Sequence, residues 1–281
     1  MKLPGVLDHI VINTRFDMER AEDIFTRLGF TLTPRGRHSL GSINHLMMFS
    51  EDYLELLGIP EAEGDKRPDV SGAPAGLNGL VFKTGNADEA YQRLDKFNMA
   101  GDPPRAFARP LILSDGTHQE ASFRTVTASA DAFPAGRLYF CEHLTPELLW
   151  REEWQTHANG VTGFTELVIV HPQPVEHADL LAGLLGHSAE SSGSDQREIM
   201  LESGFRLTVL SRDAYGKRFG ALACDGEGRE IFIGAVGLRC ADPDKLSALL
   251  DDLADQVSVS QKENGVDAAI GAFDTLICFE F

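Results

Sequence analysis

Hydrophobic residues along the chain follow a pattern in which a short apolar run precedes a helical stripe and further apolar runs. The first run, Val6–Ile12, is short and rich in β-branched residues, as in a strand covered on both faces. After Asp17, a candidate helix cap, apolar residues recur with helical spacing until Gly29, which is suited to end the helix. Strands are expected next at 30–33, 44–49 and 53–57. The first unit is therefore β-α-β-β-β.

The same pattern restarts three times. Helices are expected to begin near residues 18, 87, 176 and 244, and leading strands are expected at 80–83, 164–170 and 231–238. A further strand is expected over 105–113, and residues 60–76, rich in Pro, Gly and acidic residues, are expected to form a loop. Four βαβββ units predict an α+β fold. They pair into two expected domains, 1–150 and 160–281, joined by a connector over 143–163.

Charge and cysteine usage narrow the function classes. The net charge of −18 disfavours binding to nucleic acids and to anionic membranes, and no apolar run is long enough to span a bilayer. The four cysteines lack CxxC spacing, which argues against a zinc knuckle and a disulfide framework. The start of the chain has no signal-peptide pattern. These features predict a cytoplasmic protein that binds neither nucleic acids nor membranes.

A small basic cluster precedes the third expected strand. Arg35, Arg37 and His38 could draw an anionic substrate in an otherwise acidic protein, or they could belong to a solvated loop. Asn44 follows this loop and could order it or contact substrate. No GxSxG, Walker A or GxGxxG motif is present, so the sequence offers no recognisable nucleophile or nucleotide loop.

Several segments of the chain resemble the vicinal-oxygen-chelate superfamily, which covers glyoxalase I, extradiol dioxygenases, and the fosfomycin and bleomycin resistance proteins. The resemblance is greatest to its glyoxalase-like domain group, and it covers most of residues 5–160. The second half resembles the superfamily more in its order of strands and helices than in its sequence motifs. The segments that carry the resemblance are 7–12, 28–30, 37–44, 53–56 and 140–147. It implies that the units form two cupped mixed β-sheets with helices outside.

The resemblance also implies a metal site, whose ligands come from the first and last strands of each unit. In the first unit these positions hold His9 and Glu55. In the second unit the first-strand position is Gly79, which cannot be a ligand, and the last strand ends in Glu142 and His143, of which we favour His143. The implied set of His9, Glu55 and His143 suits a divalent Fe, Mn, Zn or Ni ion with open positions.

Each of these residues also has a structural interpretation. His9 could be a core histidine bonded to a backbone carbonyl, and Glu55 could lie on a solvated face with Tyr53 and Leu57. An ionised carboxylate inside a cup, in contrast, needs a metal or a cationic partner. His143 could instead lie in a surface turn.

In the second half the corresponding positions hold Glu166 and Glu280, with Leu207 where a last-strand ligand would fall. Two carboxylates without a histidine make a poor transition-metal site, so this half is expected to be a degenerate copy.

Three hypotheses on function follow from the resemblance. The first is a metal-dependent enzyme of glyoxalase or dioxygenase type, with lyase or isomerase activity among the alternatives. It would act on a small molecule with two adjacent oxygens, and Glu55 would be a ligand or a base. The second is a non-catalytic protein that binds or sequesters a small molecule. The third is that the second pair of units serves in homodimerisation.

Overall fold

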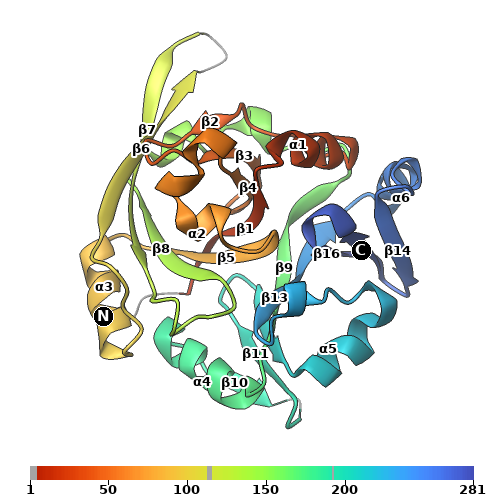
Figure 1. The fold of residues 1–281 in the computed structure, drawn as a ribbon. Coiled ribbons are helices and arrows are strands. Elements are labelled where there is room, and N and C mark those ends of the chain that lie inside the picture. The colour runs from red at the N-terminus through yellow and green to blue at the C-terminus, as the bar shows by residue number, and fades with distance from the viewer. Residues whose placement is uncertain (1–4, 113–115, 192) are drawn as a thin grey trace.

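The computed structural model describes residues 5–112, 116–191 and 193–281, and it contains two eight-stranded mixed sheets. The strand order is β2-β3-β4-β1-β5-β8-β7-β6 in the first sheet and β10-β11-β12-β9-β13-β16-β15-β14 in the second. Both sheets thus have the same order, and in each the first strand of the half lies near the middle. The longer helices lie outside the sheets, as Figure 1 shows. The predicted α+β fold with two mixed sheets and outer helices is confirmed.

The first half contains eight strands and three α-helices among the described residues. The strands are β1 (Leu7–Arg15), β2 (Gly36–Arg37), β3 (Ile43–Met48), β4 (Tyr53–Gly58), β5 (Gly76–Lys83), β6 (Arg105–Ile112), β7 (His118–Thr127) and β8 (Arg137–His143). The helices are α1 (Met18–Arg27), α2 (Pro68–Ser71) and α3 (Ala87–Lys96). β6 and β7 form a long hairpin that extends beyond the rest of the sheet (Figure 1). Residue 113, included in the predicted strand over 105–113, lies outside the described residues, as do residues 1–4 at the start of the chain.

The second half has the same strand order and also contains three α-helices among the described residues. Its strands are β9 (Val161–Val170), β10 (Ala189–Ser191), β11 (Gln196–Met200), β12 (Arg206–Leu210), β13 (Phe232–Cys240), β14 (Val257–Lys262), β15 (Gly265–Ile270) and β16 (Thr275–Glu280). Its helices are α4 (Pro174–Leu185), α5 (Arg212–Phe219) and α6 (Pro243–Asp252). The four predicted helix starts agree with α1, α3, α4 and α6.

Two local predictions were wrong, and one helix was missed. Residues 30–33 form no strand. The connector binds Thr31, whose N donates to His157 Nδ1 at 3.0 Å and whose Oγ1 donates to Thr156 O at 2.6 Å, while Thr33 N donates to Leu46 O at 2.9 Å. The loop over 60–76 contains a 3₁₀-helix, Glu61–Lys66, and α2. Helix α5 was not predicted, since Tyr215 and Phe219 are its only buried side chains and the stripe is therefore short.

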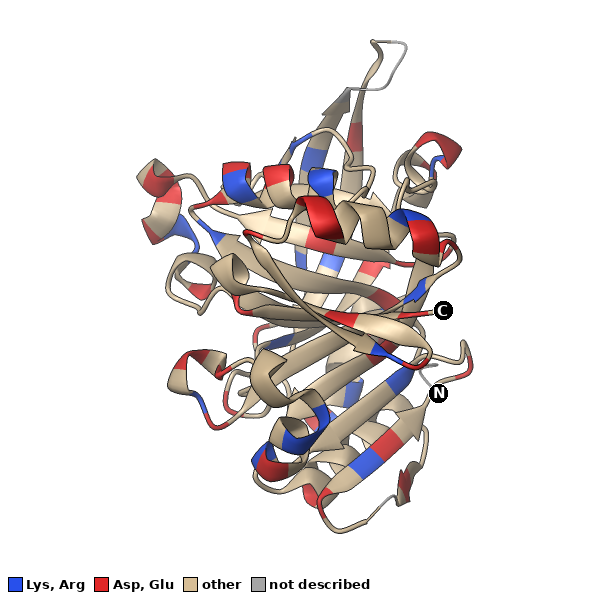
Figure 2. Cartoon of the chain, turned by 90° about the vertical axis from the view of Figure 1, so that its right-hand side faces the viewer, with Lys and Arg blue, Asp and Glu red and all other residues tan. Residues whose placement is uncertain are grey.

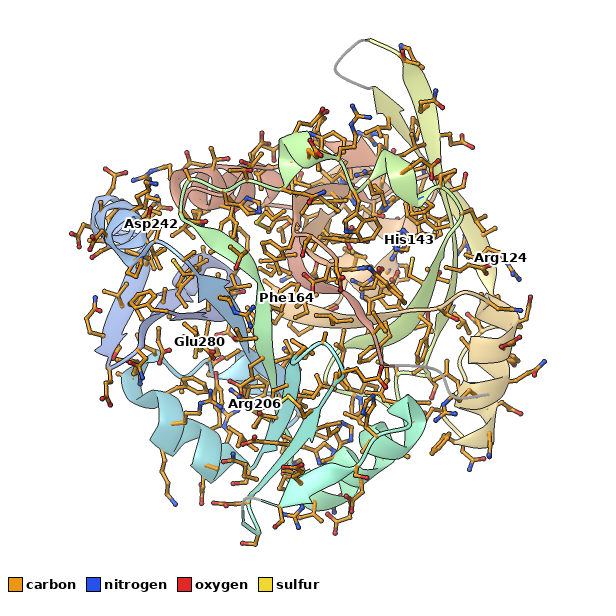
Figure 3. The ribbon with its side chains drawn as sticks, turned by 180° about the vertical axis from the view of Figure 1, so that it is seen from behind. Arg124, His143, Phe164, Arg206, Asp242 and Glu280 are labelled. Atoms are coloured by element: carbon orange, nitrogen blue, oxygen red, sulfur yellow. The ribbon has the colours of Figure 1, made fainter. Side chains whose placement is uncertain are left out.

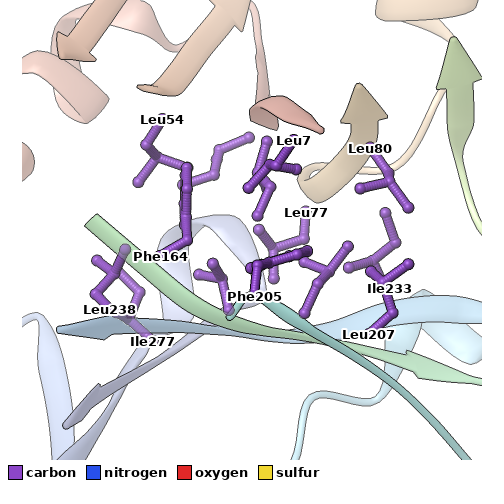
Figure 4. Packing of buried hydrophobic residues seen from close by; sticks show 14 of the residues in the cluster. Leu7, Leu54, Leu77, Leu80, Phe164, Phe205, Leu207, Ile233, Leu238 and Ile277 are labelled. Atoms are coloured by element: carbon purple, nitrogen blue, oxygen red, sulfur yellow. The ribbon is translucent and has the colours of Figure 1, made fainter. Parts of the chain in front are cut away.

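The two halves share one hydrophobic core. Figure 4 shows apolar side chains of the first half, including Leu7, Leu54 and Leu77, packed against those of the second half, including Phe164 and Phe205. The buried faces of α1, α3, α4 and α6 join this core. The other face of each sheet is concave. We call them the first cup, lined by an apolar cluster that includes Val81 and Phe123, and the second cup, lined by one that includes Val168 and Phe232. The division into domains 1–150 and 160–281 stays a prediction, although each sheet comes from one side of it.

Charged side chains are distributed over the outer elements of both halves, as Figure 2 shows, and acidic residues outnumber basic ones by 43 to 25. Within the described residues no helix is long and apolar enough to cross a membrane.

A buried histidine on α4 should make stability depend on pH. His177 stacks on His171 at 4.3 Å between ring centroids, and its Nε2 has no hydrogen-bond partner among the described residues. Burial, followed by repulsion from His171, lowers the pKa of His177 from 6.5 to about 4. The unfolded chain therefore takes up the proton first, so the free energy of unfolding should fall as pH drops from 6.5 to 4, by up to about 1.4 kcal/mol per pH unit. Urea unfolding across this range should show this slope in wild type and a smaller one in His177→Phe. An equal slope in both would contradict the assignment.

Candidate metal and substrate site

The first cup encloses a cavity of about 610 Å³. Strands β1, β3, β4, β6, β7 and β8 provide its wall, and residues 66–69 at the start of α2 contribute from the side. The wall combines aromatic and leucine side chains with a set of polar groups. The polar side chains relevant to chemistry are His9, His38, Asn44, Glu55, Arg109, Arg137 and Tyr139. The cavity is large enough for a small organic molecule.

A β-bulge at Asp8 brings two neighbouring residues of β1 into contact. In the antiparallel pairing of β1 with β5, Leu7 lies opposite Phe82 and His9 lies opposite Val81, so Asp8 is the extra residue. In a regular strand the side chains of Asp8 and His9 would point to opposite faces. Here His9 Nδ1 lies 2.8 Å from Asp8 Oδ2. An ionised carboxylate accepts only, so Nδ1 is the donor to Asp8, and Nε2 is the ring nitrogen that faces the cavity.

His9 Nε2 faces two oxygen atoms of the cup. Tyr139 Oη on β8 lies 3.0 Å away and Glu55 Oε2 on β4 lies 3.6 Å away. The ring of Tyr53 stacks on the imidazole with 4.4 Å between centroids and fixes its plane. His9 and Glu55 are 3% and 5% exposed. Burial raises the pKa of Tyr139 well above its usual value, so its hydroxyl stays protonated and donates to Nε2.

These atoms fit a divalent cation. Metal–nitrogen and metal–oxygen bonds of about 2.0–2.2 Å place two adjacent ligand atoms roughly 3–3.6 Å apart, depending on coordination angle. The separation of His9 Nε2 from Glu55 Oε2 lies at the upper end of this range. Asp8 supplies the carboxylate partner that metal-binding histidines typically have on their second nitrogen. The first-unit ligands implied by the family resemblance are thus brought together.

His143 does not join His9 and Glu55. The Nε2 atom of His143 lies 2.9 Å from both carboxylate oxygens of Asp8. Figure 3 labels His143 among the elements of the first half. Burial opposes ionisation of Asp8, but hydrogen bonds and charge interactions with His143 and His9 outweigh it and hold the pKa of Asp8 well below its usual range. The alternative ligand Glu142 lies on the outer face of the sheet, where it accepts hydrogen bonds from Ala87 N at 3.0 Å and Arg124 at 3.2 Å.

A second arrangement of ligand atoms lies beside the first. Asp8, Cys141 and His143 each offer one atom, all within 4.8 Å of one another, and this is the one such group of His, Cys, Asp and Glu side chains in the described ranges. Burial raises the pKa of the Cys141 thiol well above its usual value, so a cation would have to displace its proton. Neither Asp8 nor His143 lines the main cavity.

Asn44 connects the carboxylate to the far wall of the cup. Its Nδ2 donates to Glu55 Oε1 at 2.6 Å, and its Oδ1 accepts from Arg109 Nη1 at 3.0 Å. His38 Nε2 lies 3.3 Å from the same amide, and His38 Nδ1 lies 2.8 Å from Ser42 Oγ. Burial, together with the charges of Arg109 and Arg67, lowers the pKa of His38 to about 3, so the ring stays neutral at pH 7. Asn44 and His38 both line the cavity, where the sequence suggested contact with substrate.

The other basic residues of the predicted cluster lie elsewhere. Arg35 points to α1 and pairs with Glu19 at 2.7 Å and Glu22 at 2.5 Å. Arg37 is exposed, lies 3.6 Å from Glu63, and does not line the cavity. Its role in substrate binding stays a prediction that no contact in this structure supports.

The second cup has different contents. Glu166 occupies the position of His9, but the register places Thr208, and not Leu207, at the position of Glu55, because Val168 pairs with Thr208 as Val11 pairs with Glu55. The sequence assignment of Leu207 was off by one residue, and this residue packs in the shared core.

Helix α5 fills the second cup. Its Tyr215 and Phe219 belong to the apolar cluster of that cup, and its Arg218 binds Glu166 with contacts of 2.5 and 3.0 Å. Burial raises the pKa of Glu166, but hydrogen bonds and charge interactions, chiefly with Arg218, outweigh this effect and lower it to about 2. Glu280 contacts Arg206 at 4.0 Å. A carboxylate paired with an arginine has no need of a cation, which fits the predicted degenerate copy.

Three residues of the site were missed by the sequence reading. Tyr139 and Arg109 could have been found from strand alternation, since Tyr139 is two residues from Cys141 and Arg109 is two residues from Phe107 on strands that line a cup. Asp8 could not have been found in this way, because only the bulge turns it toward His9 and His143.

Comparisons with known proteins agree with this architecture. A family model described as a glyoxalase-like domain matches residues 7–185. No curated protein matches the chain. A hypothetical protein from Staphylococcus aureus is 10% identical, with a TM-score of 0.65 and 98% of both chains covered. A mutant of 4-hydroxymandelate synthase from Streptomyces coelicolor is 12% identical, with a TM-score of 0.61 and coverage of 99% of this chain and 92% of that one. A Mn(II)-bound glyoxalase from Novosphingobium aromaticivorans is 10% identical, with a TM-score of 0.59 and coverage of 100% and 83%. At these identities the likeness shows the fold.

Proposed function

Because the chain belongs to the glyoxalase-like domain family of the vicinal-oxygen-chelate superfamily, we propose that it is a metal-dependent enzyme acting on a small oxygen-bearing molecule in the first cup. The observation that carries the proposal is the arrangement of His9 and Glu55, whose Nε2 and Oε2 atoms lie 3.6 Å apart at the wall of the cavity. The name of one structural neighbour, a Mn(II)-bound glyoxalase, supports a divalent metal of this kind.

Each residue of the site has a part in this proposal. His9 and Glu55 would hold the cation, with the Tyr139 hydroxyl as the neighbouring oxygen. Asp8 would orient His9 and raise its basicity, and His143 would hold Asp8 in place. When bound, the cation would act as a Lewis acid that stabilises an enolate or oxyanion of the substrate. Asn44 restrains Glu55 through Oε1 and leaves Oε2 free to bind a cation or accept a proton.

The apolar lining of the cup would exclude water from the reacting atoms. Tyr53 covers one face of the His9 ring, and Phe123 also lines the cavity. In such surroundings the charge of a cation acts on the substrate with less screening than in water. The second cup lacks these features because α5 fills it, so we assign the activity to the first cup alone.

Titration of chelator-treated protein with Mn²⁺ tests the proposal. We expect wild type to bind one Mn²⁺ ion. Loss of a residue that only hydrogen-bonds a metal ligand typically lowers metal affinity roughly 10–100-fold, and His9→Ala should lower it by more than this because it removes a ligand. The matched control is His118→Ala, which removes an exposed histidine and should leave the Mn²⁺ affinity unchanged. Equally weak binding by wild type and His9→Ala, measured by calorimetry and by electron paramagnetic resonance of free Mn²⁺, would refute the proposal.

A second candidate function is binding of a small molecule without chemistry. It is favoured by Gly79, which offers no ligand from the second unit. A Cβ at this position would lie 2.6 Å from Val11 Cγ2, so the site cannot accommodate a larger residue without rearrangement. In this case the ligand-induced rise in melting temperature should be the same with Mn²⁺, with EDTA and in His9→Ala. For the enzyme the rise should be larger with Mn²⁺.

A further inference from the structure

The cavity of the first cup differs in charge from the rest of the molecule. The protein has a net charge of −18, yet five basic and three acidic residues line this cavity. Two of the acidic residues, Asp69 and Glu55, already have partners: Asp69 binds Arg67 through contacts of 2.7 and 2.8 Å and lies 3.6 Å from Arg137, and Glu55 accepts from Asn44. The remaining charged residues of the lining include Lys66, Arg105 and Asp102, which are exposed. The interior thus holds the half-buried Arg67 and Arg137 and the buried Arg109, and its one buried carboxylate is that of Glu55.

Arg109 carries the least compensated part of this charge. It is 1% exposed, and its Nη1 donates to Asn44 Oδ1 at 3.0 Å. Its Nε and Nη2 have no hydrogen-bond partner among the described residues, and no carboxylate there forms an ion pair with it. Burying a charged group without a partner is costly, so such groups generally have one in the functional state. Burial also lowers the pKa of Arg109 from its ordinary value.

The geometry of the free atoms indicates what the partner is. Nε and Nη2 form one edge of the planar guanidinium, and this edge can donate two parallel hydrogen bonds to the two oxygens of a carboxylate. The third nitrogen is held by Asn44, which fixes the plane of the fork. Gly36 on β2 provides the space for this arrangement, because a Cβ there would collide with Arg109 and with Asn44.

The surroundings of the fork are apolar and aromatic. The rings of Phe107 and Phe123 stack with 5.1 Å between centroids, and His38, neutral at pH 7, packs edge-on against Phe107 at 5.4 Å. All three residues line the cavity together with Arg109. They would contact the body of a ligand whose charged end lies on the guanidinium.

We propose that Arg109 is the anchor for a carboxylate group of the ligand, and that this carboxylate is attached to an apolar or aromatic body. The claim that this ligand is the substrate rests on the proposed function. Arg109 contacts Asn44, Asn44 contacts Glu55, and Glu55 lies beside His9, so the anchor is connected to the proposed cation site. A molecule anchored on Arg109 by its carboxylate is thereby directed with its other functional group toward Glu55 and His9.

Calorimetric titration of EDTA-treated protein tests the anchor without the metal. The probes are acetate, benzoate and phenylacetate, together with benzamide and phenylacetamide, which have the same shape as the two aromatic acids without the charge. We expect at least one aromatic acid to bind wild type about tenfold or more tightly than its amide, and Arg109→Met to lose this preference. The matched control is Arg124→Met, which removes an arginine on the outer face of neighbouring β7 (Figure 3) and should keep the preference.

Each outcome decides the inference. Absence of binding by all three acids, equal binding of acid and amide, or an unchanged preference in Arg109→Met would overturn it. Circular dichroism establishes whether Arg109→Met is folded. If it is not, Arg109→Lys, which keeps the charge but loses the fork, should bind the acids more weakly than wild type, and equal binding would overturn the inference.

A parallel Mn²⁺ titration separates this inference from the proposed function. If wild type fails to bind Mn²⁺ but prefers acid to amide, the proposed function fails while the carboxylate anchor holds. If wild type binds Mn²⁺ but shows no such preference, the anchor fails alone.

Discussion

Replacing Asp8 with asparagine should weaken Mn²⁺ binding by about 10–100-fold without abolishing it, the usual effect of losing the outer partner of a metal-binding histidine. Asparagine keeps the shape and an acceptor oxygen for His9 Nδ1, but it lacks the charge that raises the basicity of Nε2. It also loses the ionic partner of His143. The measurement is the Mn²⁺ titration of wild type and Asp8→Asn, with exposed Asp88→Asn as the matched control.

Cobalt substitution distinguishes the two ligand arrangements. If the cation lies between Asp8, Cys141 and His143, then Asp8→Asn and Cys141→Ser should both abolish binding, and the Co²⁺ protein should show a thiolate-to-metal absorption band. With the cation on His9 and Glu55 we expect no such band, and Cys141→Ser should bind Mn²⁺ as wild type does. A thiolate band that disappears in Cys141→Ser would move the proposed centre away from Glu55.

Elements with a strong local signal were predictable from the sequence. The start of α3 is an example, since Asn86 accepts hydrogen bonds from Asp88 N and Glu89 N, as its capping sequence predicts. Helix α5 has a cap as well, with Ser211 accepting from Ala214 N, but two buried residues one turn apart do not make a recognisable stripe. The failure at residues 30–33 has a tertiary component, because the partners of Thr31 come from a connector more than 120 residues away.

The residues of the candidate site were likewise only partly predictable from the sequence. His9, Glu55 and Asn44 lie on strands whose positions the sequence predicted, and they meet in the cup. The contact of Asp8 with His9 depends on one bulged residue in the pairing of β1 with β5, which no local pattern reveals. The same limit explains the one-residue error at Leu207, since register in a strand pair is set by the partner and a shift of one residue exchanges the two faces.

Replacing Arg218 with methionine should destabilise the protein by about 3 kcal/mol, the lower end of the range for breaking a buried ion pair. Glu166 is 1% exposed, and the variant loses two of its hydrogen bonds. Arg206 at 3.2 Å and the Thr208 hydroxyl at 2.5 Å remain, and Arg218 is itself 35% exposed, which keeps the loss from being larger. Urea unfolding of wild type and Arg218→Met at pH 7 measures the effect.

The double variant Glu166→Gln, Arg218→Met identifies the cause. It removes the buried charge together with its partner, so it should be more stable than Arg218→Met alone. The pH dependence should change with it. The pKa of Glu166 is about 2 in the folded protein and 4.5 in the reference state, so its contribution to stability is complete above pH 4.5 and is lost as pH falls toward 2. In Glu166→Gln the free energy of unfolding should not show this loss between pH 4.5 and 2. If the double variant were no more stable than Arg218→Met, loss of packing by α5, and not an unpaired carboxylate, would account for the destabilisation.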